Sequence, residues 1–288
     1  MRLKASLKNS ANPGLLLKLS IFIILSLSGC LNNLEPTYKE QDIPSVIKRI
    51  CKEEYNLEVI TIRMPTTLWI YAPLPKILHQ DYGIKKDKIF DEEIADKLRN
   101  ILNTIGRVII SSDNAPDFFA LVASDINLGI DYTIIGNVLD MRKSYAGFTP
   151  WTETNRRYVI RFALAPGAIN DETGTHLKNS DIRLPDFLAE QIAQRIAVQF
   201  QEEGFKKYFK VTKTEGGFID RDFIFEYSIE QIAQPKNKIN ILREILDTIT
   251  YCIKTYEFRD FSRVVITDLI TADKLILNQQ EIWSRVVK

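Results

Sequence analysis

Two stretches of this sequence, one with a helical pattern and one with a strand pattern, each occur twice. The segment LRNILNTI at 98–105 matches LREILDTI at 242–249 at six of eight positions. DFFALVASDI at 117–126 aligns with DFSRVVITDL at 260–269 at an offset of 143 residues, against 144 for the first pair. Because a helical segment and a strand segment repeat at nearly the same offset, an internal duplication is favoured over a chance likeness of two Ile/Leu-rich helices.

The duplication determines the expected fold. Two copies of a helix–strand–turn–strand unit are too few for a solenoid, and 288 residues with 45% hydrophobic content suffice for two cores. Strands joined by tight turns pair antiparallel. We therefore predict an α+β protein of two related small modules with antiparallel sheets, each covered by helices. The first module is expected at 43–142, an aromatic and arginine-rich linker at 143–157, and the second module at 158–288.

The spacing of apolar residues places the individual elements. Helical periodicity predicts helices over about 43–55, 91–105, 185–203 and 238–249. Gly106 is expected to end the second of these, so that RVIISS after it should be a strand. Runs of β-branched and aromatic residues predict further strands, which include LEVITIR, TLWIYAPL, DFFALVAS, IDYTIIGNV, RRYVIRFALA, FKKYFKVTK, DRDFIFEYSI, YCIKTY, SRVVITDLI and DKLILN.

Residues 1–29 have the pattern of an export signal. Basic residues without any acid precede a short apolar run that ends in Leu27-Ser28-Gly29-Cys30. The run is shorter than the roughly 20 apolar residues that a membrane-spanning helix needs. The tetrapeptide resembles the lipobox of bacterial lipoproteins, in which small residues precede an obligatory cysteine. The alternative is a chance cysteine after an ordinary signal or a short anchor.

The resemblance implies an anchor and a location. Signal cleavage between Gly29 and Cys30 would make Cys30 the lipid-carrying N-terminus, and two or three acyl chains hold a protein stably on a bilayer. Residues 30–42 would then be the lipidated cysteine and a tether of at most about 40 Å. Leu31, rather than an aspartate, follows the cysteine. We expect a lipid-anchored protein of the cell membrane or outer membrane that faces the periplasm or the exterior.

The charge distribution excludes one class of partner. The formal charge of +1 includes four basic residues in the first 29, which leaves 34 basic against 37 acidic residues in the rest of the chain. A net charge of −3 after residue 29 argues against nucleic acid or another polyanion as the partner.

Local catalytic motifs are missing from the sequence. It holds two histidines, His79 and His176, and none of the usual spacings of a hydrolase, a zinc site or a phosphate-binding loop. Asp125 and Asp268 end the repeated strands, where aspartate usually forms a turn. We therefore predict no catalytic residue, no metal site and no cofactor.

Cys51 and Cys252 are the two cysteines that follow Cys30. An oxidising envelope would permit a disulfide between them. Free cysteine, however, is among the most buried residue types. The apolar surroundings of both residues in the sequence favour two separate buried thiols.

The linker at 143–157 holds the candidate binding residues, which are Tyr145, Phe148, Trp151, Arg156 and Arg157. Aromatic and arginine side chains on a loop are typical of protein-contact hot spots. The same aromatics could instead fill the junction between the modules, which also needs large apolar side chains. The sequence leaves both interpretations open.

These observations leave three classes of function. The first, which we predict, is a non-enzymatic scaffold or adaptor that binds another envelope protein, and a bare sheet edge would support it. The second is a binder of a small ligand or glycan in the groove between the modules, with Trp69, Trp151 and neighbouring tyrosines stacking on sugar rings. The third is an envelope hydrolase assembled from distant residues, which the missing motifs disfavour.

Overall fold

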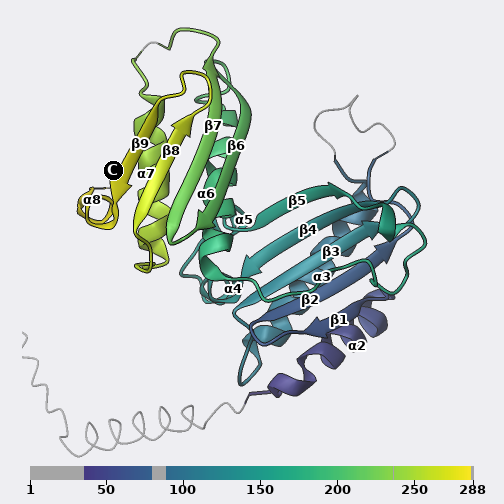
Figure 1. Ribbon diagram of the computed structural model, residues 1–288. Helices are drawn as coiled ribbons and strands as arrows, with labels where there is room; N and C mark the ends of the chain where they lie inside the picture. Colours follow the sequence, from purple (N-terminus) through teal and green to yellow (C-terminus); the bar gives the residue numbers. More distant parts are fainter. Residues whose placement is uncertain (1–35, 80–88, 236, 287–288) are drawn as a thin grey trace, which may run out of the picture.

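The computed structural model describes residues 36–79, 89–235 and 237–286, which form two modules, each a sheet covered by helices (Figure 1). The lipobox at 27–30 lies outside the described residues. The first sheet and its helices are η2 (Glu40–Asp42), α2 (Ile43–Tyr55), β1 (Ile60–Arg63), β2 (Thr67–Leu74), α3 (Glu92–Ile110), β3 (Phe118–Asp125), β4 (Ile130–Asn137), α4 (Val138–Tyr145), α5 (Trp151–Asn155) and β5 (Val159–Leu164). After η3 (Pro166–Ala168) come α6 (Leu184–Gln201), β6 (Phe209–Ile219), β7 (Asp222–Gln231), α7 (Ile241–Thr255), β8 (Arg263–Asp268), β9 (Lys274–Asn278) and α8 (Gln279–Ser284).

Both modules have the same topology, which confirms the predicted pair of related α+β modules. Each consists of a helix, a hairpin, a second helix and a second hairpin. The strand order is β1-β2-β3-β4 in the first module and β6-β7-β8-β9 in the second. The repeated sequences occupy equivalent places, because α3 and β3 in one module correspond to α7 and β8 in the other.

The sheets are antiparallel at their hairpins but parallel at their centres. Strands β2 and β3 pair parallel, and so do β7 and β8. In each case a helix connects the two strands and returns the chain to the same end of the sheet, which makes the pair parallel. The sequence had indicated the tight turns correctly but not this crossover.

Strand β5 corrects the predicted boundary between the modules. The pattern RRYVIRFALA is a strand, but it pairs antiparallel with β4 at the edge of the first sheet. The first sheet therefore extends to Leu164, past the boundary expected at residue 158. The predicted linker also differs, since most of 143–157 lies in α4, α5 and the turn between them.

Gly106 does not end a helix, as the sequence had indicated, but lies inside α3, which continues to Ile110. A Cβ atom at Gly106 would lie 2.5 Å from the hydroxyl oxygen of Tyr145. The glycine is therefore needed for the close approach of α4 to α3, and RVIISS is helical up to Ile110. YCIKTY, which was also predicted as a strand, forms the last turn of α7 because the apolar stripe of that helix continues through it.

Helix α6 belongs to the cores of both modules. Helices α2 and α3 cover one face of the first sheet, where Ile47, Ile101 and Phe119 are fully buried. On the opposite face, the ring of Phe118 from β3 lies 5.2 Å from that of Phe187 on α6. The same helix packs on β6 and β7, so one apolar cluster runs from the first sheet into the second module.

The two cysteines are free, buried thiols in different cores, as the sequence favoured. Burial raises the pKa of Cys51 to about 11 and that of Cys252 to about 12. Thiols of this kind are inert at neutral pH because the thiolate is the reactive form.

Ile101 and Ile245 hold equivalent positions of the repeated helices, and both are fully buried. Replacing either by alanine should lower the free energy of unfolding by about 2–5 kcal/mol, because the substitution leaves a cavity. Leu139→Ala, at a position that is 57% exposed, should change it by at most about 0.5 kcal/mol. Urea denaturation measures all three variants, and an unaffected isoleucine variant would contradict the structural equivalence of the two helices.

Candidate functional site: the module joint and the β5 edge

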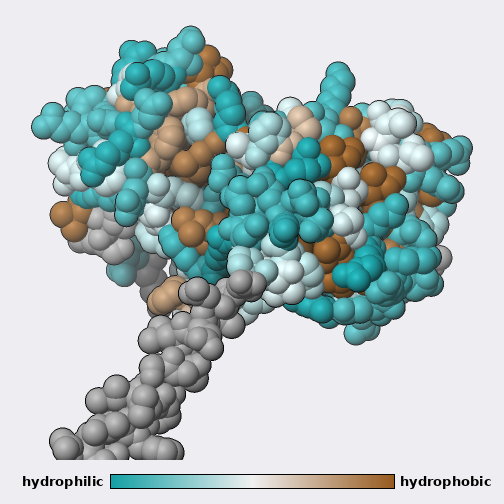
Figure 2. Space-filling view, turned by 90° about the horizontal axis from the view of Figure 1, so that it is seen from below, coloured by the Kyte–Doolittle hydropathy of each residue, from teal (hydrophilic) through white to brown (hydrophobic). Residues whose placement is uncertain are grey.

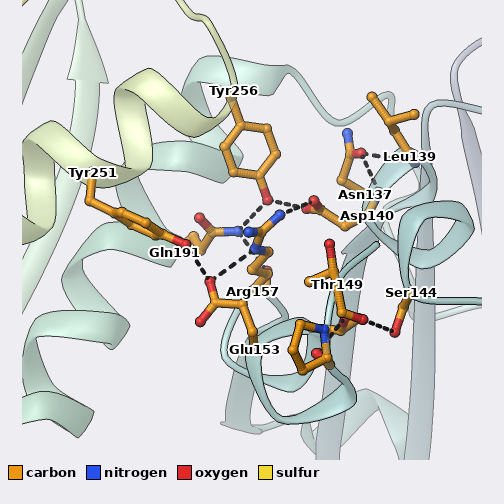
Figure 3. Close-up of polar contacts among 12 residues, drawn as sticks. Asn137, Leu139, Asp140, Ser144, Thr149, Glu153, Arg157, Gln191, Tyr251 and Tyr256 are labelled. Atoms are coloured by element: carbon orange, nitrogen blue, oxygen red, sulfur yellow. Dashed lines mark hydrogen bonds and ion pairs between the residues drawn. The ribbon is translucent and has the colours of Figure 1, made fainter. Parts of the chain in front are cut away.

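The two modules meet at a cluster of hydrogen-bonded side chains, here called the joint network (Figure 3). Its members are Asp140, Glu153, Arg157, Gln191, Arg195, Tyr251 and Tyr256. The buried guanidinium of Arg157 lies in the network between Asp140 and Glu153. Its Nη1 donates to Asp140 at 2.6 Å and its Nε donates to Glu153 at 3.1 Å.

Residues from α6 and α7 complete the network. Arg195 donates to both oxygens of Glu153 at 2.9 and 3.0 Å, and the Tyr251 hydroxyl donates to Glu153 at 3.1 Å. The Tyr256 hydroxyl donates to Asp140 and accepts a bond of 2.7 Å from Gln191. Each carboxylate is thus held by groups from both sides of the joint.

Mutual pairing keeps the charges of the joint network in place. Burial would raise the pKa of Glu153, but bonds from Arg195 and Arg157 outweigh it and the pKa is lowered. Burial would lower the pKa of Arg157, but Asp140 and Glu153 outweigh it and the pKa is raised. Burial, reinforced by the charge of Asp140, raises the pKa of Tyr256 far above its ordinary value. These groups hold the modules together and are not poised for proton transfer at neutral pH.

The five candidate residues of the predicted linker do not form one surface. Arg157 belongs to the joint network, and the exposed Arg156 pairs with Glu202 at 2.5 Å. The rings of Tyr145 and Trp151 meet edge-on at 4.9 Å. Phe148 is 84% exposed and Trp151 is 47% exposed. The junction interpretation therefore describes Arg157, whereas Phe148 and Trp151 face solvent.

Local sequence builds the turn that carries these aromatics. Asn137 caps α4 by accepting bonds from the backbone N–H groups of Leu139 and Asp140. Gly147 takes a positive φ of 78°, a conformation that favours glycine. The Ser144 hydroxyl donates to the carbonyl of Thr149 at 3.1 Å, which holds the two sides of the turn together.

His176 lies between two carboxylates on the sheet face opposite α2 and α3. Its Nδ1 is 2.7 Å from Asp171 and its Nε2 is 3.2 Å from Asp131. Burial would raise the pKa of Asp171, but bonds from His176 and Thr173 hold it well below its usual range. The cluster is nearly buried and fastens the segment 165–183 to the sheet. The other histidine, His79, lies 3.3 Å from Asp91.

The two repeated aspartates form turns, as predicted. Asp125 accepts bonds from the backbone N–H groups of Asn127 and Leu128 at 3.1 and 2.9 Å. Asp268 accepts one from Ile270 at 2.8 Å. The second carboxylate oxygen of Asp125 also accepts a bond of 3.0 Å from the backbone N–H of Ile77, so this aspartate ties its turn to a distant segment as well.

A groove of about 550 Å³ lies between the start of β5 and the helices α6 and α7. Its walls include Tyr158, Gln199, Arg243, Glu244 and Tyr251. Neither tryptophan proposed for sugar stacking is among its lining residues, which corrects that expectation. Trp69 lies instead under the segment 165–183, where its Nε1 donates to the carbonyl of Ser180 at 2.9 Å.

The outer edge of the first sheet is β5, and part of this edge is bare. Gln194 of α6 bonds both backbone groups of Ile160, accepting from its nitrogen at 2.9 Å and donating to its oxygen at 2.7 Å. Because backbone groups point alternately to the two sides of a strand, those of Phe162 and Leu164 point outward as well. No described residue bonds to their outward groups, and their side chains are 44% and 84% exposed.

Comparison with known proteins gives no match, whether to a family model, a curated protein or a solved structure. Within residues 36–79, 89–235 and 237–286, no helix combines the length and the apolar content that crossing a bilayer requires. The same residues hold no group of three or more His, Cys, Asp or Glu side chains that could bind a metal ion.

Arg157→Met should destabilise the protein by about 3–5 kcal/mol, because it leaves the buried Asp140 without its cationic partner. Arg156→Met is the matched control, and loss of its exposed pair with Glu202 should cost at most about 1 kcal/mol. Denaturant unfolding of both variants measures the difference. Equal effects at the two neighbouring arginines would contradict the assigned role of the joint network.

Glu153 should make the joint sensitive to acid. Its pKa is lower in the folded chain than in the unfolded one, so its ionised form contributes stability above the unfolded value of about 4.3. That contribution is lost as the pH falls through the folded pKa. Glu153→Gln should therefore be less stable than wild type at about pH 7, and the gap should narrow toward pH 3. Thermal unfolding across this range is the measurement, and a constant gap would contradict the prediction.

Proposed function

We propose that the protein is a membrane-anchored envelope lipoprotein that acts as a non-enzymatic adaptor through protein contacts. The lipobox-like Leu27-Ser28-Gly29-Cys30 supports the anchor. The bare edge of β5 is the observation that carries the adaptor role, because such an edge is a template for an added strand. A partner strand would bond to Phe162 and Leu164 and pack its own side chains against theirs.

One of the two edge strands of the second sheet, β6, carries features that protect a strand against further pairing. Strand β6 has a bulge between Val211 and Lys213, and Lys213 pairs with Glu215 and Glu226. Bulges and charges are the usual protections of an edge against further pairing. Strand β5 pairs with β4 without a bulge, and its Ile160, Phe162 and Leu164 side chains are exposed and apolar, which supports a role in recognition. Its one charged side chain, Arg161, is paired with Glu190 of α6.

A photo-crosslinking residue in place of Phe162 should capture an envelope protein in intact cells. Leu164→Pro should abolish the capture, because proline removes an outward N–H while sparing the bonds to β4. Leu164→Thr is the matched control, since it keeps that N–H and should keep the capture. Capture that is equal in the proline and threonine variants would show that the strand edge is not the contact.

Cells grown with a labelled fatty acid should incorporate the label into the wild-type chain, and Cys30→Ala should lose it. The reason is that the Cys30 thiol would accept the lipid before the signal is removed. Gel fluorography of the immunoprecipitated chain is the measurement. An unlabelled wild type, or a variant with as much label, would refute the lipoprotein assignment.

The groove between the modules supports a second candidate function, the binding of a small polar ligand or glycan. Its lining by tyrosines, amides and both signs of charge is suited to hydroxyl-rich molecules. Titration calorimetry with soluble envelope glycan fragments tests this, with Gln199→Leu as the variant that should weaken binding. If no fragment gives a heat of binding, glycan binding in the groove is refuted and the adaptor role remains.

A further inference from the structure

The turn between α4 and α5 displays large apolar side chains on a well-held backbone. We call Tyr145, Phe148 and Trp151 the aromatic turn. The backbone N–H of Phe148 donates to the carbonyl of Lys143 at 2.8 Å, which, with the Ser144 bond to Thr149, closes the turn. Phe148 nevertheless packs so little that 84% of it is exposed. Exposed apolar side chains that are held in place indicate a contact surface.

The aromatic turn is connected to the end of the first module at which the described chain begins. The backbone N–H of Tyr38 donates to Ser111 just after α3, at 3.1 Å. Within the last turns of α3, Arg142 donates to the carbonyl of Ile109 at 3.1 Å, and Tyr145 packs over Gly106. Figure 1 shows α4 and the first described residues, just before α2, at the same end of the sheet.

The chain between the lipid site and this end is short. Five residues separate Cys30 from Pro36, and the six steps between their Cα atoms reach at most about 20 Å when fully extended. If Cys30 carries the lipid, the bilayer surface must lie within that reach of the face on which the chain begins. Figure 2, which looks at the molecule from below the view of Figure 1, shows hydrophobic spots among hydrophilic residues.

The charges beside the aromatic turn suit an anionic surface. Arg142 and Lys143 pair with no carboxylate in the described part of the chain. Of the acids near the turn, Asp140 and Glu153 are neutralised in the joint network, whereas Asp117 and Asp181 line the pocket that Arg142 also lines. Basic residues next to exposed Trp, Tyr and Phe are typical of segments that lie in the headgroup region of a membrane.

We infer that the aromatic turn rests in the headgroup region of the bilayer that carries the lipid anchor. Phe148 and Trp151 enter the boundary with the acyl chains, and Lys143 faces lipid phosphates. The inference rests on the proposed lipoprotein function. Two contacts, the acyl chains and the aromatic turn, then fix which face of the first module points to the membrane.

The test uses the lipidated full-length mature protein in vesicles of phosphatidylethanolamine and phosphatidylglycerol, with plain or brominated acyl chains. Bromine quenches tryptophan fluorescence only at short range. The chain has three tryptophans, of which Trp69 lies under the segment 165–183 and Trp283 lies on α8 of the second module. Brominated lipid should quench the wild type and the Trp283→Phe variant, whereas Trp151→Phe should lose most of the quenching.

Flotation of the same vesicles separates this inference from the anchor itself. Protein that does not float with the vesicles would overturn the anchor and, with it, this inference. Protein that floats but shows equal emission in plain and brominated vesicles would overturn the inference alone, as would quenching that survives Trp151→Phe. Phe148→Ser should reduce the quenching of Trp151 and leave the unfolding midpoint unchanged. Replacing phosphatidylglycerol by phosphatidylcholine should also reduce it, and quenching unaffected by this exchange would refute the role of Lys143.

Discussion

The buried guanidinium of Arg157 is the constraint on which the arrangement of the two modules depends. A charge taken out of water costs several kcal/mol unless it is paired with good geometry. Its partners Asp140 and Glu153 precede it in the chain, but they are themselves held by Arg195, Tyr251 and Tyr256 from the other side of the joint. The charges are therefore fully compensated only when the modules are docked. The apolar contacts of α6 with both sheets also stabilise the docked arrangement.

The parts of the structure that depart from the internal repeat are also the parts that carry candidate functions. The shared topology of helices and hairpins supplies two similar scaffolds. Between them, residues 138–164 form α4, the aromatic turn, α5 and β5. Helix α8 follows β9 as α4 follows β4, but the described residues up to 286 hold no counterpart of α5 or β5. The joint network, the exposed aromatics and the bare sheet edge all draw on residues 138–164. The repeated elements thus provide the scaffold, and the segment between them provides the surfaces.

The strand order separates the proposed anchor from the proposed partner site. The described part of the chain begins beside β1 and α2, whereas β5 is the opposite edge of the same sheet. With neighbouring strands about 5 Å apart, four intervals place the two edges roughly 20 Å from each other. A partner strand on β5 would therefore meet an edge that lies away from the tether. This geometry suits a protein that must hold the membrane and a partner at once.

The sequence by itself determined the two modules, their helices of strong periodicity, the turn-forming Asp125 and Asp268, and the separate burial of Cys51 and Cys252. These properties depend on local pattern, which is why they could be predicted. Tertiary structure decided the parallel central pairs, the place of β5 and the helical course of the chain past Gly106. It also decided which residues of the predicted linker are buried and which are exposed. Arg157 is buried and its neighbour Arg156 exposed because only the first meets carboxylates that residues from α6 and α7 hold in place. Arg195, Tyr251 and Tyr256, which hold those carboxylates, are distant in the chain, so no local pattern could separate the two arginines.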